Sequence, residues 1–247
     1  MTAIWSAEME RIITYTGRGS NGYIIVGEKT IAVDTGNLPG KDAFLTVCEE
    51  NGVCPQSIGL IVITHGHEDH FQNANQMREA TGAPILCHEK AAQALREGQK
   101  PHVLPRNEVG IIAFNHGQEM ERMAKEHPEM APPMAPIEPV QPDIVWSGEY
   151  DLKPWGIDGR IIETPGHSEG CTSVVLSSGA AFTGDLVVTE PDSRRSTIAM
   201  FTYRENNDEE VRASVRKLLP LAETWYSGHG GPFSRAEVRA MLDAETE

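Results

Sequence analysis

Basic residues are scarce in this chain. Its 247 residues include 21 Lys and Arg against 36 Asp and Glu, which gives a formal net charge of -15 at pH 7. A surface of this sign repels a phosphate backbone, and the sequence shows no local cluster of basic residues that would offset the repulsion. We therefore expect a small-molecule substrate and no binding to nucleic acid.

Long apolar runs are also absent. The sequence nowhere reaches the roughly 18 consecutive apolar residues of a membrane-spanning helix, so no membrane contact is expected. Residues 1–11 lack the cationic stretch and apolar core of a secretory signal. These absences predict a cytoplasmic location.

Cysteine is rare. The four copies, Cys48, Cys54, Cys87 and Cys171, show no CxxC spacing, so a disulfide framework is not expected. Isolated cysteines in a cytosolic chain are mostly small buried apolar residues. The length and the 39% of hydrophobic residues suffice for a substantial core, in one large α/β domain or two small ones.

Strand patterns punctuated by glycine alternate with helical patterns. We predict strands over 12–15, 23–26, 30–33, 58–63, 84–87, 150–152, 159–163, 171–176, 179–183 and 225–227, and helices over 41–51, 71–81, 89–97, 208–219 and 234–244. Asn207 is expected to cap the fourth of these helices, and Ser234 should form a capping box with Glu237 on the last. This order indicates helices that cover a sheet.

The composition changes between about residues 99 and 147. Six prolines within residues 128–142 exclude regular structure there, whereas residues 110–125 could form a helix. Such segments are usually lids, binding loops or partner contacts, and Met120 and Met123 suit an adaptable apolar surface that could pair two copies into a homodimer. A loop that merely packs on the surface is an equally open alternative.

Three histidines and two acidic residues lie close together at residues 65–70. Residues 64–70 read THGHEDH and directly follow the apolar run 58–63, which predicts a buried strand. His65 and His67 would then point to one side, and the next turn can bring Asp69 and His70 to the same place. Imidazole and carboxylate suit zinc, and also iron or manganese. We predict metal binding, with solvated loop histidines as the alternative.

Further potential ligands also follow predicted strands. His167, Asp185 and His229 each stand beside a glycine just after a strand, and Asp34 ends the third strand. If the strands lie side by side, these side chains converge at one edge of the sheets, and glycine permits the tight backbone that convergence requires. A buried group of this kind without a cation would carry a large desolvation cost, which two divalent ions remove. For Asp34 alone, a structural turn is an alternative.

In these motifs the chain resembles the metallo-β-lactamase superfamily. The HxHxDH signature of that family stands at residues 65–70, its Pro-Gly-His turn ends in His167, its Gly-Asp pair ends in Asp185, and its last histidine is His229. The resemblance implies a four-layer αββα sandwich of two mixed β-sheets. It also implies a single domain over residues 1–247, with the segment at about 99–147 as an insertion.

The resemblance assigns a role to each candidate residue. One metal ion would take His65, His67 and His167, a second would take Asp69, His70 and His229, Asp185 would bridge the two, and Asp34 would support the site from behind the ligands. Two divalent ions, zinc before iron or manganese, would activate a bridging hydroxide for attack, while Asp69 would orient or relay the proton. These roles predict a dinuclear metallohydrolase for a small ester, thioester or lactone, or for a phosphodiester.

Two other classes of function stay open. An iron-dependent oxidoreductase of the persulfide dioxygenase type would use one metal ion, and the seven ligands favour two. A non-catalytic metal-binding module ranks lower because structural metal sites are typically closed and rich in cysteine.

Two residues are candidates for substrate contact. Tyr203 could replace the tyrosine that lactonases of the family carry after the bridging aspartate, and a structural tyrosine is the alternative. Arg194 could meet an anionic group, and a solvated arginine on an acidic protein is the alternative.

Overall fold

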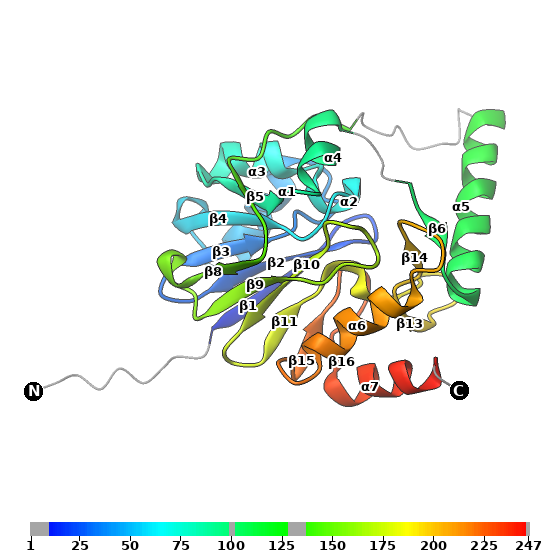
Figure 1. The fold of residues 1–247 in the computed structure, drawn as a ribbon. Helices are drawn as coiled ribbons and strands as arrows, with labels where there is room; N and C mark the ends of the chain where they lie inside the picture. The colour runs from blue at the N-terminus through cyan, green and yellow to red at the C-terminus, as the bar shows by residue number, and fades with distance from the viewer. Residues whose placement is uncertain (1–9, 99–101, 128–136, 246–247) are drawn as a thin grey trace, which may run out of the picture.

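Four layers form the structure, a computed structural model that describes residues 10–98, 102–127 and 137–245 (Figure 1). Two six-stranded sheets face each other in the middle. Helices α1 (Lys41–Glu50), α3 (Ala74–Thr81) and α4 (Ala92–Glu97) cover the first sheet, and α6 (Asp208–Leu218) and α7 (Arg235–Ala244) cover the second. The predicted αββα sandwich is therefore confirmed.

Both sheets are mixed. The first has the order β1 (Arg11–Thr16), β2 (Asn21–Val26), β3 (Thr30–Val33), β4 (Ile58–Ile63), β5 (Ile85–His88) and β7 (Ile144–Trp146), antiparallel up to β3 and parallel from there on. The second has the order β16 (Phe233–Ser234), β15 (Thr224–Tyr226), β11 (Ala180–Phe182), β10 (Thr172–Leu176), β9 (Gly159–Glu163) and β8 (Glu149–Asp151), in which only β11 and β15 pair in parallel.

The strand sequences explain the layers. Along β4, Ile61 and Ile63 face α1, α3 and α4, whereas Leu60 and Val62 face the second sheet. A strand that is buried on both faces requires apolar residues at successive positions, which is why 58–63 is a nearly continuous apolar run. On the second sheet, Val175 of β10 packs toward α6 and α7.

Several boundaries differ from the predictions. Residues 144–146, which the sequence analysis included in the insertion, form β7 at the edge of the first sheet. The helix predicted over 71–81 begins at Ala74 as α3, and a separate short helix, α2 (Glu68–Phe71), precedes it, so Asp69 and His70 lie on a helical turn. The helix within the insertion is α5 (Glu108–Glu126), and the proline-rich residues 128–136 lie outside the described part of the chain.

The two predicted helix caps have different outcomes. Ser234 accepts a hydrogen bond from the Glu237 backbone and forms the expected capping box. Asn207 stands at the N-terminus of α6, but its side chain makes no capping hydrogen bond. Its Nδ2 donates instead to the Gly166 carbonyl oxygen at 2.9 Å, which fixes the turn before His167.

Short elements connect the longer helices and strands. They are η1 (Pro55–Ser57), η2 (Lys153–Trp155), η3 (Gly184–Leu186), and the paired strands β12 (Val187–Thr189) with β13 (Ser196–Ile198) and β6 (Leu104–Pro105) with β14 (Phe201–Thr202). Among the described residues, no helix combines the length and apolarity that crossing a bilayer requires.

Candidate metal centre

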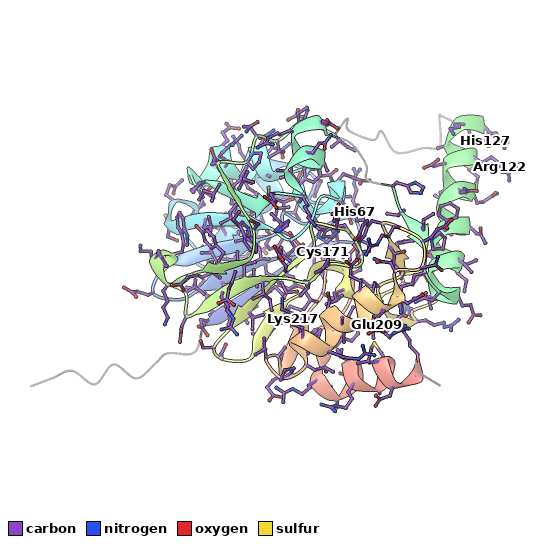
Figure 2. All side chains as sticks on the ribbon, in the orientation of Figure 1. His67, Arg122, His127, Cys171, Glu209 and Lys217 are labelled. Carbon is purple, nitrogen blue, oxygen red and sulfur yellow. The ribbon has the colours of Figure 1, made fainter. Side chains whose placement is uncertain are left out.

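The predicted ligands come from four strand ends. His65 and His67 follow β4, and Asp69 and His70 lie on α2 just beyond. His167 follows β9, Asp185 lies in η3 after β11, and His229 follows β15. His67 marks this edge in Figure 2, on the side of the molecule where α5 stands.

Two groups of ligand atoms form at this edge. The first triad is His65, His67 and His167, and the second triad is Asp69, His70 and His229. In the first, His67 Nδ1 lies 3.0 Å from His65 Nε2 and 2.8 Å from His167 Nε2. In the second, Asp69 Oδ2 lies 3.2 Å from His229 Nε2 and 3.7 Å from His70 Nε2.

Asp185 lies between the two triads. Its Oδ2 is 3.5 Å from His167 Nε2 and 3.3 Å from His229 Nε2, and its Oδ1 is 3.3 Å from His70 Nε2. With Asp185 counted in the first group, the ligand atoms of each group lie within 4.8 Å of one another. One carboxylate therefore reaches both groups.

The donor atoms fit cations. Within the described residues, His70 Nε2 and Asp185 Oδ1 are buried and make no hydrogen bond. In the first triad three ring nitrogens converge, and neutral imidazoles cannot satisfy all of those contacts because each carries one N–H group. Positive ions that accept lone pairs from both groups would satisfy these atoms, so the residues present fit two divalent metals.

Backbone and side-chain oxygens orient the other nitrogen of four rings. His70 Nδ1 donates to Asp34 Oδ2 at 2.8 Å, His65 Nδ1 to Thr64 Oγ1 at 3.1 Å, His167 Nδ1 to the Phe201 carbonyl at 3.2 Å, and His229 Nδ1 to the Gly19 carbonyl at 2.8 Å. Such contacts fix the tautomer and direct each Nε2 toward the centre.

Asp34 supports two rings at once. Besides His70, its Oδ2 accepts from Thr64 Oγ1 at 2.7 Å, and its Oδ1 accepts from the Thr64 backbone N–H at 2.8 Å. Because Thr64 Oγ1 gives its proton to Asp34, it is free to accept from His65. Asp34 thus holds His70 directly and His65 through Thr64, from behind the ligands.

The histidines of the two triads differ in the direction of their pKa shifts. Burial lowers the pKa of His67 to about 3 and also lowers the pKa of His65 and His167. Burial acts in the same direction on His70 and His229, but the carboxylates of Asp185 and Asp69 raise the pKa of both well above its usual value. The first triad is therefore kept neutral, the form that binds metal, while protons on the second can balance the carboxylates when no cation is present.

Glycine is required next to the ligands. A Cβ at Gly228 would collide with Asp185 Oδ1 and lie 2.5 Å from His70 Cε1. Gly184 has a φ of +50° and would bring a Cβ within 2.7 Å of Thr64 Oγ1. The glycines that flank Asp185 and His229 in the sequence thus allow the ligand loops to approach.

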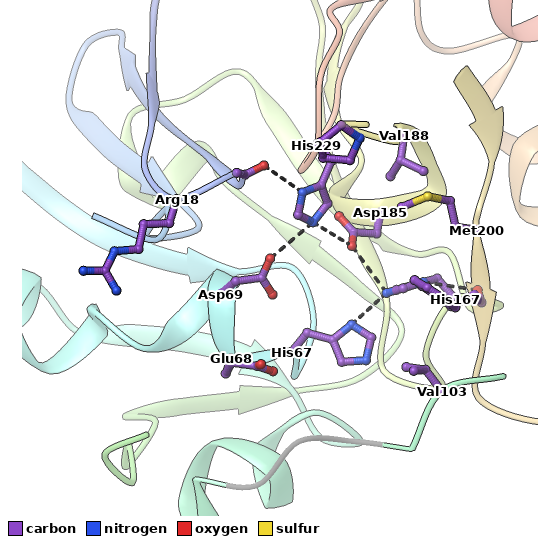
Figure 3. A pocket seen from close by; sticks show the side chains of 13 residues that line it. Arg18, His67, Glu68, Asp69, Val103, His167, Asp185, Val188, Met200 and His229 are labelled. Carbon is purple, nitrogen blue, oxygen red and sulfur yellow. Dashed lines mark hydrogen bonds and ion pairs between the residues drawn. The ribbon is translucent and has the colours of Figure 1, made fainter. Parts of the chain in front are cut away.

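A cavity of about 360 Å³ opens beside the centre (Figure 3). Five ligands line it, together with Arg18, Gly19 and Glu68 and five apolar side chains. The ligands are His67, Asp69, His167, Asp185 and His229, and the apolar residues are Val103, Val188, Pro191, Met200 and Phe201. A small molecule can therefore reach both triads.

Comparison with known families decides the relationship. Residues 15–229 match the family model of the metallo-beta-lactamase superfamily. The chain belongs to this superfamily. Its ligand groups occupy the positions at which the superfamily motifs were recognised in the sequence.

Relatives within the superfamily are distant. A probable metallo-hydrolase of Methanocaldococcus jannaschii is 28% identical over 69% of this chain and 68% of its own length. A hydroxyacylglutathione hydrolase of Cereibacter sphaeroides is 27% identical over 85% of this chain, which spans 62% of that protein. Among solved structures, the B3 metallo-beta-lactamase BLEG-1 superposes with a TM-score of 0.67 at 20% identity, over 97% of this chain and 100% of its own.

The structure brings neither predicted substrate residue to the superfamily site. The Tyr203 hydroxyl donates to Glu210 Oε2 at 2.9 Å, and the ring lines a neighbouring cavity with Ser168. Arg194 is exposed on the turn after Glu190 and does not line the metal cavity. Closeness to Asp185 in sequence was a poor guide, because Arg194 lies on the exposed turn between β12 and β13 and the Tyr203 hydroxyl is directed to α6.

Sequence reasoning missed Arg18 and the apolar residues of the cavity. Arg18 stands in the loop between β1 and β2, and its neighbour Gly19 holds His229. The glycines around it marked a turn but gave no sign that the turn faces the metal ligands. Apolar residues such as Val103 and Met200 carry no pattern that separates a cavity wall from the core.

Proposed function

We propose that this superfamily member is a dinuclear metallohydrolase that cleaves a small ester, thioester or lactone. The observation that carries the proposal is the position of Asp185, within 3.5 Å of His167 Nε2 and 3.3 Å of His70 Nε2. A carboxylate shared between two ligand sets suits two metal ions, and an accessible cavity suits catalysis better than a closed structural site.

Two bound divalent ions, zinc in the first place and iron or manganese as alternatives, would supply a hydroxide nucleophile near neutral pH and polarise the substrate oxygen. The first triad with Asp185 would hold one ion, and the second triad with Asp185 the other. Asp69 adjoins the cavity with a quarter of its side chain exposed. Burial would raise its pKa, but His70 and His229 hold the pKa well below its usual value, so Asp69 is ionised and can orient or accept a proton.

The cavity favours a small substrate. Its volume of about 360 Å³ lies near the lower end of the range for ligand sites. Glu68 at the cavity and the net charge of -15 disfavour a phosphodiester, which ranks below the acyl compounds. The relative named hydroxyacylglutathione hydrolase supports thioester chemistry.

A combined metal and activity analysis tests the proposal. Protein purified without added metal should contain two equivalents of zinc, iron or manganese and should hydrolyse one class in a panel of esters, thioesters, lactones and phosphodiesters. The His67→Ala variant should lose metal and turnover, because His67 Nδ1 faces both other rings of the first triad. Full activity in this variant would refute the assignment.

The alternatives predict other results. One equivalent of iron, oxygen uptake with a persulfide and no hydrolysis would identify an oxidoreductase of the persulfide dioxygenase type. Bound metal without any turnover would identify a binding module. The proposal includes a cytoplasmic location, which the four free cysteines support because they suit a reducing compartment.

A further inference from the structure

The cavity beside the metal centre has two unlike sides. In Figure 3, Val103, Val188 and Met200 lie on one side of the view, and Arg18 and Asp69 lie on the other. We call the five apolar lining residues the apolar wall: Val103, Val188, Pro191, Met200 and Phe201. Water forms no hydrogen bonds with such a surface. An apolar group of a ligand that displaces this water is therefore stabilised by the hydrophobic effect.

Part of the apolar wall is packed against α5. Val188 and Met200 are 1% and 8% exposed and pack against Val109 in the first turn of α5. The helix comes so close at Gly110 that an added Cβ would collide with the Met200 carbonyl oxygen. The same oxygen accepts a hydrogen bond from the Arg106 backbone N–H at 2.9 Å. A preformed wall of this kind binds a ligand at little cost in ordering.

The two sides of the cavity belong to different triads. Phe201 joins the apolar wall to the first triad, because its carbonyl oxygen accepts from His167 Nδ1 at 3.2 Å. Gly19, next to Arg18, joins the polar side to the second triad, because its carbonyl oxygen accepts from His229 Nδ1 at 2.8 Å. A substrate that spans both triads would therefore place one end against apolar carbon and the other near a guanidinium group.

We propose that the apolar wall binds the acyl chain of the substrate, so that the protein selects esters, thioesters or lactones with an apolar acyl group. The inference rests on the proposed hydrolase function and places the acyl half of that substrate against the apolar wall. The polar leaving group lies on the Arg18 side. Among the residues that line the cavity, Arg18 is the single Lys or Arg, so a leaving group with several negative charges is disfavoured.

An acyl series with one fixed leaving group tests the inference on metal-loaded protein. From acetyl to butyryl to hexanoyl, kcat/KM should rise by about fourfold for each methylene that the wall buries, mainly through a lower KM. In Val188→Thr and in Met200→Gln, which exchange an apolar group for a polar one of similar size, the hexanoyl-to-acetyl ratio should fall about tenfold. Val145→Thr is the matched control: Val145 is 42% exposed on β7, and this variant should leave the ratio unchanged.

A binding measurement separates this inference from the hydrolase proposal. Calorimetry on metal-free protein should show that hexanamide binds more tightly than butanamide, with a more negative heat-capacity change, and that Met200→Gln removes the difference. Hydrolysis at equal rates along the series, with equal binding of the two amides, would overturn the inference and leave the hydrolase intact. The absence of hydrolysis for every ester, thioester and lactone would overturn the hydrolase proposal, and with it the assignment of an acyl substrate.

Discussion

Asp34→Asn tests how strongly the metal centre depends on a carboxylate behind the ligands. Asp34 Oδ2 accepts from His70 Nδ1 at 2.8 Å and from Thr64 Oγ1 at 2.7 Å. An amide has one oxygen for the positions of Oδ1 and Oδ2, so its NH2 group must face either the N–H of His70 or the backbone N–H of Thr64. In the first case the ring can avoid that contact by carrying its proton on Nε2, the atom that is aimed at the centre. The exchange therefore either protonates a ligand atom or breaks the contact that holds the Thr64 backbone, and it removes no ligand.

The magnitude follows from the contacts. Loss of one partner behind a metal-binding histidine typically lowers metal affinity by about 10–100-fold. At 1.36 kcal/mol for each factor of ten, this range corresponds to ~1.4–2.7 kcal/mol. We expect the upper part of the range because Thr64, which passes the contact on to His65, loses its acceptor as well. Asp34 has a φ of +55°, a conformation that Asn adopts readily, so the variant should fold.

Competition for zinc between metal-free protein and a chromogenic chelator measures this affinity, and circular dichroism checks the fold. Asp42→Asn is the matched control, because Asp42 is exposed on α1 and its change removes the same charge away from the site. A folded Asp34→Asn variant that binds two zinc ions as tightly as the unchanged protein would refute the reasoning.

Three further predictions concern the centre and α5. Gly228→Ala should reduce metal content, measured by elemental analysis, because the new Cβ collides with Asp185; full loading would contradict that close approach. Zinc at about 100 times its Kd should stabilise metal-stripped protein by ~2.7 kcal/mol, seen by scanning calorimetry as a Tm rise of about 5–10 °C, and an unchanged Tm would argue against a native metal site. Copies should pair through α5, where Met120 is 53% exposed, and Met120→Glu should shift sedimentation toward monomer; a monomeric unchanged protein would exclude the dimer.

The parts of the site that the sequence predicted are those with a local chemical signature. His65, His67, Asp69 and His70 lie within six residues and have few roles together other than metal binding, and the remaining ligands each follow a strand beside a glycine. The same logic predicted helices that cover a sheet, because β4 is apolar on both faces and the helices are apolar on one. The four αββα layers were expected from the resemblance to the superfamily. A local sequence pattern is sufficient to predict a structural or functional role when the residues in it have one dominant role together.

The parts that the sequence did not predict depend on contacts between distant segments. β7 has only three residues, and its pairing with β5 joins positions far apart in the chain. Tyr203 was predicted to contact the substrate, but it does not line the metal cavity, and its hydroxyl donates to Glu210 of α6. Asn207 was expected to cap α6, yet a better partner, the Gly166 carbonyl, is supplied by a loop some 40 residues earlier. For β7 and Asn207 a contact with a distant segment replaced the local arrangement that the sequence favoured, and for Tyr203 the partner lies on the next helix.

The insertion is the clearest example of such dependence. Its composition differs from that of the flanking residues, and the resemblance to the superfamily implied a segment added to the fold. Its first helical turn nevertheless contacts Met200, and the next residue, Phe201, accepts the hydrogen bond from the metal ligand His167. A change at the base of α5 can therefore reach the first triad through two successive backbone carbonyls. The base of α5 is therefore linked to the candidate metal centre. The insertion, whose composition differs from that of the flanking residues, thus lies beside the cavity in which a substrate would bind.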